Sequence, residues 1–186
     1  MTTLYLDMDG VVADFDSAAA EFLGLDHVRD YVSAHYKITP EEWTQLKTNP
    51  RFYRTLPKMK SADSLVDLAR RCRDRLGWDL KFLTAVPKNH DMPWAYSDKV
   101  LWAQEHYPDI PVMFGPLSVD KQRHCSLGDL LIDDRVDNCE RWRAAGGRAF
   151  RVEGNDIGAS ISWLGEILSH YEVSADLARR VSVDLY

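Results

Sequence analysis

Apolar residues run in short continuous blocks along this chain, and each block ends at a polar or glycine-containing turn. Such blocks predict the buried strands of a parallel sheet, because helices cover both faces of a sheet of that kind. We predict strands at Thr3–Leu6, Asp79–Thr84, Pro111–Phe114, Leu130–Ile132 and Arg148–Val152.

The segments between these strands repeat their apolar residues at intervals of three and four, as amphipathic helices do. The predicted helices are Asp14–Leu23, Ala62–Leu76, Pro93–Tyr107, Asp137–Ala145 and Ser160–Tyr171. Thr39 and Pro40 predict the start of a further helix, since threonine caps and proline suits the first turn. Ser61 is expected to cap the helix that follows it. The tail after Tyr171 is either helical or frayed.

Strands that alternate with helices favour an α/β fold with a Rossmann-like, doubly wound parallel sheet. The polar and aromatic stretch between Asp26 and Arg54 interrupts this alternation. We therefore expect a core domain of residues 1–15 and 77–186, with a small helical cap, residues 16–76, inserted after the first strand. A chain of 186 residues suits one such core with a modest insertion.

The charge balance narrows the class of partner. The formal net charge is −6, and no block of Lys and Arg forms the electrostatic footprint that long nucleic acid or an anionic membrane attracts. No apolar stretch reaches the ~20 residues that span a bilayer. We expect a cytoplasmic protein. The three cysteines are widely spaced and predict neither a disulfide framework nor a zinc site.

Candidate chemistry gathers where the predicted strands end. Asp7 and Asp9 follow the first strand and precede Gly10, Thr84 ends the second, Lys121 lies beyond the end of the third, and Asp133 and Asp134 follow the fourth. The carboxyl ends of parallel strands share one edge of the sheet, so these carboxylates would crowd together. Each like-charge pair at ~4 Å costs on the order of 4 kcal/mol at an effective dielectric constant of about 20, which calls for a cation. Oxygen ligands alone favour Mg²⁺.

Each of these residues also has an ordinary explanation when it is taken singly. Thr84 suits a strand as a β-branched residue, Lys121 suits the surface as a solvated charge, and Asp133–Asp134 suit a helix cap. Their common order along the chain is what favours a site.

That order resembles a known set of motifs. Asp7-Met8-Asp9-Gly10, Leu83-Thr84, Lys121 and Ile132-Asp133-Asp134 look like the four motifs of the haloacid dehalogenase (HAD) superfamily phosphatases. The longer segments Leu6–Phe15 and Leu130–Arg135 resemble those of the 5'(3')-deoxyribonucleotidases. The resemblance extends over about residues 4 to 152.

The resemblance implies a role for each motif residue. Asp7 would attack phosphorus to form an aspartyl phosphate, and Asp9 would act as general acid and then as general base. Asp7, the backbone carbonyl of Asp9, and Asp134 would hold Mg²⁺, with Asp133 beside them as a ligand or an outer partner. Thr84 and Lys121 would hold the phosphoryl oxygens.

The resemblance is less complete around the substrate. Lys88 and Lys99 are alternatives to Lys121 for the phosphate contact. Lys88 also falls where the nucleotidases place a lysine. Ala85 and Val119 stand where those enzymes have Ser and Arg. Phe15 matches an aromatic residue of their base pocket, whereas Trp43, Phe52 and Tyr53 align loosely. All four aromatics are candidates for the substrate pocket, and all four also suit the packing of the cap.

The hypothesis is a Mg²⁺-dependent phosphomonoesterase that hydrolyses (deoxy)nucleoside monophosphates, with a small nucleotide as its partner. One rival is a HAD phosphatase for a nucleic-acid 3'-phosphate or a small sugar phosphate. A second is a non-catalytic phosphate-binding module, which the pairing of Asp7 with Asp9 disfavours. The sequence leaves open the base, the sugar, the position of the ester and the oligomeric state, a homodimer included.

Overall fold

The computed structural model describes residues 2–25, 38–87, 92–115, 117–153 and 157–183, with residues 175–183 described by their backbone. The elements in chain order are β1 (Thr3–Leu6), α1 (Phe15–Leu23), α3 (Pro40–Leu46), the 3-10 helix η1 (Tyr53–Thr55), α4 (Ala62–Leu76), β2 (Asp79–Thr84), α5 (Trp94–His106), β3 (Val112–Phe114), the 3-10 helix η2 (Ser118–His124), β4 (Leu130–Asp133), α6 (Val136–Ala144), β5 (Arg148–Arg151) and α7 (Gly158–Val183).

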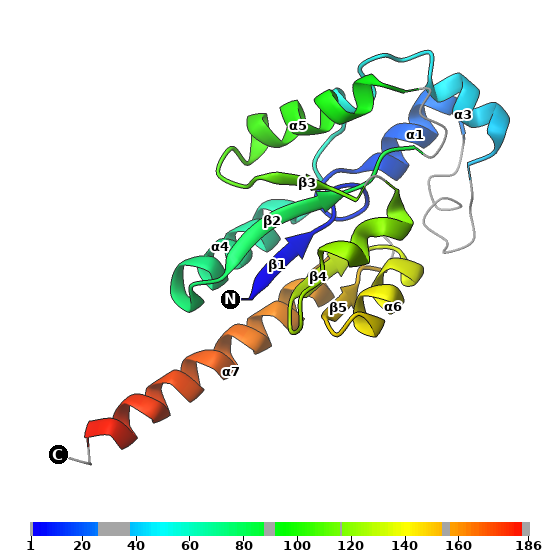
Figure 1. Ribbon diagram of the computed structural model, residues 1–186. Helices are drawn as coiled ribbons and strands as arrows, with labels where there is room; N and C mark the ends of the chain where they lie inside the picture. The colour runs from blue at the N-terminus through cyan, green and yellow to red at the C-terminus, as the bar shows by residue number, and fades with distance from the viewer. Residues whose placement is uncertain (1, 26–37, 88–91, 116, 154–156, 184–186) are drawn as a thin grey trace.

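The strands form one sheet in the order β3-β2-β1-β4-β5, and every neighbouring pair is parallel (Figure 1). β1 lies at the centre, where Leu6 faces Phe82 of β2 on one side and Ile132 of β4 on the other. The ends of β1 and β4 are therefore neighbours at the carboxyl edge. This confirms the predicted α/β fold with a doubly wound parallel sheet.

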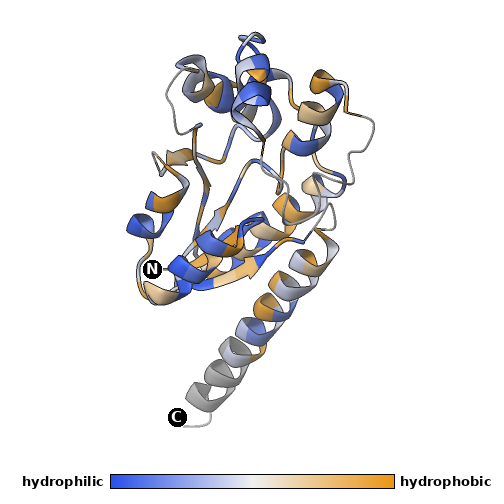
Figure 2. Cartoon of the chain, turned by 90° about the vertical axis from the view of Figure 1, so that its right-hand side faces the viewer, coloured by the Kyte–Doolittle hydropathy of each residue, from blue (hydrophilic) through white to orange (hydrophobic). Residues whose placement is uncertain are grey.

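Successive strand residues point to opposite faces, and each face has its own core. Leu6 and Ile132 pack with residues of α4, α5 and α7 in the larger apolar cluster, whereas Tyr5 and Leu131 pack with Trp142 of α6. The surrounding helices contain both hydrophobic and hydrophilic residues, as expected for helices with one buried face (Figure 2). Helices thus cover both faces, which explains why the strands are continuously apolar.

The segment after β1 contains α1, α3 and η1, and α1 contacts α3. α3 begins with the predicted cap: Glu42 N donates to Thr39 Oγ1, and Thr39 N donates to the Glu42 side chain. α4 instead packs against β2 and α7 of the core. The division into a core of residues 1–15 and 77–186 and a cap of residues 16–76 stays a prediction, and the packing of α4 favours a boundary before that helix.

Two local expectations were wrong or incomplete. Ser61 lies before α4 with φ 67°, in the left-handed region, and its side chain makes no capping hydrogen bond. The backbone of the tail continues α7 without a break to Val183, so the chain stays helical well beyond Tyr171. Within the part of the chain that the structure describes, no helix is long and apolar enough to cross a membrane.

Gly147 yields a test of the packing on the α6 face. A Cβ atom there would lie 2.3 Å from Trp142 Nε1 and 2.6 Å from Cys125 Sγ. We expect Gly147→Ala to lower the free energy of unfolding by about 1–3 kcal/mol in urea denaturation, because overpacking a filled core forces neighbours apart. The matched control is Gly165→Ala in α7, whose new Cβ would meet only Leu68 Cδ2 at 4.0 Å. An equal stability of the two variants would contradict this packing.

Candidate active site

Three carboxylates meet at the carboxyl edge of the sheet. Asp7 directly follows β1, and its N–H donates to the carbonyl oxygen of Ile132 (2.9 Å), which holds it beside the end of β4. Asp133 ends β4, and Asp134 follows it. Asp7, Asp133 and Asp134 each place one carboxylate oxygen within 4.8 Å of the others. These three carboxylates are close enough together to hold a metal ion.

The turn after β1 brings the chain close to these acids. The Met8 carbonyl accepts hydrogen bonds from the N–H groups of Val11, Val12 and Ala13, which closes a tight loop. Gly10 has φ +73°, and a Cβ atom there would lie 3.0 Å from Asp134 Oδ2. A glycine is needed at this position for its backbone conformation and for the close approach.

Lys121 lies between two of the carboxylates. Its Nζ is 2.7 Å from Asp7 Oδ2 and 2.8 Å from Asp133 Oδ2, and only 2% of the side chain is exposed. It comes from η2, not from the end of a strand. η2 can approach because Gly115 has no side chain: a Cβ there would lie 3.0 Å from Lys121 Cγ. The ammonium group neutralises part of a charge that burial would otherwise forbid.

Asp133 and Asp134 differ in their remaining hydrogen-bonding capacity. Asp133 Oδ1 accepts from Arg135 N and Asn138 Nδ2, and Oδ2 accepts from Asn138 Nδ2 and Lys121 Nζ. Asp134 Oδ1 is buried and has no hydrogen-bond partner among the described residues. The geometry thus favours Asp134 as the residue with an oxygen free for a cation, and Asp133 as an outer partner.

Burial dominates the titration of this cluster. It raises the pKa of Asp7 to about 7, with Lys121 acting against the rise and Asp133 and Asp9 adding to it. Burial and the charges of Asp133 and Asp7 raise the pKa of Asp134 well above its ordinary value. Three ionised acids with one lysine leave net negative charge at the site, which suits a hard divalent cation.

Asp9 belongs to a second ion pair. Its Oδ2 lies 2.5 Å from Lys99 Nζ, and Lys99 also donates to Thr84 Oγ1 at 2.9 Å. The Asp9 Oδ1 atom is buried and has no partner among the described residues. Lys99 Nζ lies 4.6 Å from the centre of the Tyr53 ring, a cation–π contact. Asp9, Thr84 and Lys99 therefore form one cluster beside the acids.

The predicted aromatic residues also come together. The Phe15 ring lies 6.1 Å from that of Trp43, 5.5 Å from that of Phe52 and 5.9 Å from that of Tyr53, measured between centroids. Phe52 and Tyr53 are buried, with 3% and 2% of their surface exposed, whereas Phe15 and Trp43 are half-buried. The burial of Phe52 and Tyr53 favours a packing role, whereas Phe15 and Trp43 keep surface that a ligand can contact. Lys88 lies outside the described residues.

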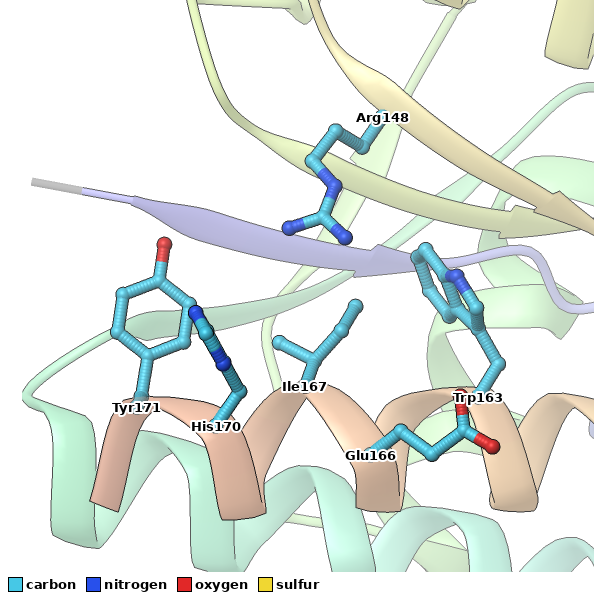
Figure 3. Close-up of a pocket in the computed structure, with 6 residues that line it drawn as sticks. All are labelled: Arg148, Trp163, Glu166, Ile167, His170 and Tyr171. Atoms are coloured by element: carbon cyan, nitrogen blue, oxygen red, sulfur yellow. The ribbon is translucent and has the colours of Figure 1, made fainter. Parts of the chain in front are cut away.

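A shallow groove elsewhere on the molecule is separate from this site. It lies between the start of β5 and α7 (Figure 3). Its lining residues are Arg148, Trp163, Glu166, Ile167, His170 and Tyr171. Arg148 begins β5, at the amino edge of the sheet, so the groove is on the opposite edge from Asp7.

The comparison with protein families decides the class. The family described as 5' nucleotidase, deoxy (pyrimidine), cytosolic type C protein matches residues 1–155. The chain belongs to this family. Its members are phosphoric monoester hydrolases of the HAD superfamily, so the chain is an enzyme of that class, a nucleotide phosphatase. The match confirms the resemblance that the motifs carry, and no curated protein matches the chain significantly.

Two solved structures are similar to the chain at low sequence identity. A hydrolase from Pseudomonas syringae is 13% identical with a TM-score of 0.48, over 85% of this chain and 88% of that one. A phosphonoacetaldehyde hydrolase-like protein from Oleispira antarctica is 13% identical with a TM-score of 0.49, over 84% of this chain and 75% of that one.

Sequence reasoning missed two residues of the site. It gave Lys99 only as an alternative phosphate contact. The structure places Lys99 on the buried face of α5, together with Ala95, Asp98, Trp102 and Ala103. It gave Asn138 no role. Asn138 lies five residues after Asp133 and inside the predicted helix Asp137–Ala145, and this spacing was a signal that could have pointed to it.

The raised pKa of Asp7 predicts a pH dependence of stability in the metal-free protein. An unfolded aspartate titrates near pH 3.9, whereas Asp7 in the folded chain holds its proton up to about pH 7. The folded state therefore binds more protons in this window, and its stability falls as the pH rises from about 4 to about 7. We expect Asp7→Asn to flatten this fall in urea denaturation with a chelator present. Parallel curves for the two proteins would contradict the prediction.

Proposed function

We propose that this nucleotidase hydrolyses (deoxy)nucleoside monophosphates with Mg²⁺, through an aspartyl phosphate on Asp7. The observation that carries the proposal is the placement of Asp7 at the carboxyl edge, next to the Lys121 ammonium group and within 4.8 Å of an Asp134 oxygen. A nucleophile, a counter-charge for a phosphoryl group and a cation site are thereby adjacent.

The donor set fits Mg²⁺. Asp7 and Asp134 would hold the ion together with the backbone carbonyl of Asp9, and Asp133 would orient its neighbours from outside. The buried, unpartnered Asp134 Oδ1 and the all-oxygen chemistry of the cluster support this assignment. When bound, Mg²⁺ would neutralise the carboxylates and polarise a phosphoryl oxygen.

The reaction would run in two displacements. A carboxylate oxygen of Asp7 attacks phosphorus, the bond from phosphorus to the sugar oxygen breaks, and Asp9 protonates that oxygen as the nucleoside leaves. Water then attacks the phosphoryl group, Asp9 takes its proton, and the bond to Asp7 breaks to release phosphate. Lys99 would hold Asp9 Oδ2, so that Oδ1 faces the leaving oxygen.

Phosphoryl oxygens would be bound by Thr84 and Lys121, with Lys99 beside Thr84. Lys88 stays in the proposal as a further phosphate contact, on the resemblance alone. Ala85 cannot supply the hydroxyl that a serine would, and Lys99, 2.9 Å from Thr84 Oγ1, is a donor close enough to compensate.

The base would contact Phe15 and Trp43, whose rings are half-buried and 6.1 Å apart. Stacking on an aromatic side chain stabilises a bound base by about 1–3 kcal/mol. Phe52 and Tyr53 would support Phe15 from behind. We propose soluble nucleotides of the cytoplasm as substrates and not long nucleic acid, because the chain has a net charge of −6 and its sequence has no block of Lys and Arg.

A phosphate-release screen tests the proposal. All nucleoside 5'- and 3'-monophosphates, ribo and deoxy, are compared with a sugar phosphate and a 3'-phosphorylated oligonucleotide, each with Mg²⁺ and with chelator. Mg²⁺-dependent release from mononucleotides is expected. Preference for the oligonucleotide or the sugar phosphate would identify a different phosphatase. Equal rates of phosphate release with Mg²⁺ and with chelator would show that the reaction needs no metal.

Replacement of the nucleophile is the sharpest mutational test. Asp7→Asn should lower phosphate release by on the order of 10³-fold or more, because an amide cannot attack phosphorus effectively. Circular dichroism should show an intact fold. The covalent mechanism is wrong if the variant keeps wild-type turnover.

Asp133, the last residue of β4, and Asp134, which follows it, both predict a change in the metal titration. Asp134→Ala should raise the Mg²⁺ concentration for half-maximal activity, and Asp133→Ala should change it in the same direction by about 10- to 100-fold through lost support of the site. The control is Asp129→Asn, a buried carboxylate at the amino end of β4 that accepts from Thr3 N and Ser126 N. Titrations that match the wild type in both alanine variants would remove these residues from the metal site.

The role of Asp9 predicts a dependence on the leaving group. A sugar alkoxide needs protonation to leave, and a positioned acid contributes about 10²- to 10⁴-fold, whereas nitrophenolate leaves unaided. Asp9→Asn should therefore slow the first step on a nucleotide far more than on p-nitrophenyl phosphate. The aryl ester should show a burst followed by slow turnover, since water still lacks its base. Equal first-step losses without a burst would place the acid elsewhere.

A further inference from the structure

The buried side chain of Asn138 links α6 to Asp133 and to the start of η2. Its side-chain amide nitrogen donates to both Asp133 oxygens, at 2.9 and 3.0 Å. Its carbonyl oxygen accepts from Ser118 Oγ at 2.8 Å. Asn138 lies in the first turn of α6 and is buried, with 3% of its surface exposed.

These bonds bear on the place of Lys121. Ser118 is the first residue of η2, and Lys121 follows it one turn later. Asn138 therefore ties the start of η2 to Asp133, the same carboxylate that Lys121 contacts. Gly115 lets η2 lie close against the end of β3. A short 3-10 helix has weak internal hydrogen bonds, so such outside contacts decide where its side chains point.

We propose that Asn138 is a positioning residue for the phosphatase reaction: it holds Asp133 and the start of η2 so that the Lys121 ammonium group stays on Asp7. The proposal rests on the proposed function, in which Lys121 meets the transferring phosphoryl group. Without the amide, Asp133 would lose two of the hydrogen bonds that it accepts. The less well compensated charge of Asp133 would then draw Lys121 away from Asp7.

The chemistry of position 138 supports this role over simple packing. Asparagine is a poorer helix former than leucine or alanine, and a buried amide costs free energy unless it is hydrogen-bonded. An apolar residue of similar size would fill the same space at lower cost. The amide is explained by what it donates to Asp133 and accepts from Ser118.

The first test compares two replacements of Asn138. Asn138→Asp keeps the shape but turns the donor into a second carboxylate facing Asp133, whereas Asn138→Ala removes both bonds. We expect kcat on nucleoside monophosphates to fall about 10- to 100-fold in Asn138→Ala, with KM changed by less than about threefold, and to fall further in Asn138→Asp. A space-filling role would make the isosteric aspartate the milder change, which would overturn the proposal.

The second test follows Lys121 directly, without turnover. Acylation of lysines by an amine-reactive reagent, read by mass spectrometry, should be several-fold faster at Lys121 in the Asn138 variants than in the wild type. Lys99 is an internal control, since it is 1% exposed and belongs to the other ion pair. Equal acceleration at both lysines would mean general loosening, and an unchanged Lys121 would mean no positioning; either result overturns the proposal.

Further variants keep the test decisive. Ser118→Ala removes only the outer bond and should shift kcat and Lys121 labelling in the same direction by a smaller factor, which also serves if the Asn138 variants do not fold. Asp129→Asn should lower stability but leave kcat and the labelling ratio unchanged. Absence of phosphate release by the wild type would refute the proposed function alone, because the labelling ratio still decides where Asn138 holds Lys121.

Discussion

The arrangement of this site depends on one electrostatic constraint: the negative charge of the carboxylates buried at the ends of β1 and β4 must be balanced in part, but not completely, by a positive charge. Lys121 does this by sharing one ammonium group between Asp7 and Asp133. The parallel pairing of β1 with β4 brings the acids together, and Gly10 and Gly115 provide the close approaches that the set requires. One ammonium group does not balance the charge of all the carboxylates, and the net negative charge that remains suits the site to a cation that can in turn bind a phosphoryl group.

Much of this edge could be predicted from the sequence because its signals are local. Strands that are buried on both faces are continuously apolar, and the residue that follows such a strand lies at the sheet edge whatever the rest of the chain does. Asp7, Thr84 and Asp133 were placed by this reasoning alone. Lys121 was expected near a strand end, but it lies on η2, which has no comparable periodic signal.

The remaining features depend on neighbours that are distant in the chain. Lys99 is buried only because Asp9 and Thr84, from two other segments, meet its charge, and a helix pattern by itself assigns lysine to the solvent. The sequence alone does not separate a pocket from a core role for Phe52 and Tyr53, because the distinction depends on how η1 packs against α5. Ser61 has the chemistry of a cap, yet its left-handed backbone makes no capping bond.

The sharing of Lys121 has a consequence for how this sequence can diverge. Removing one member of a buried charge pair leaves its partner uncompensated and costs about 3–5 kcal/mol, whereas replacing a whole buried set by apolar residues is often neutral. Lys121 is therefore retained for stability, whatever it contributes to turnover. Loss of the lysine while both carboxylates remain would cross a stability valley, so a lineage released from selection for turnover would lose the carboxylates before the lysine or together with it.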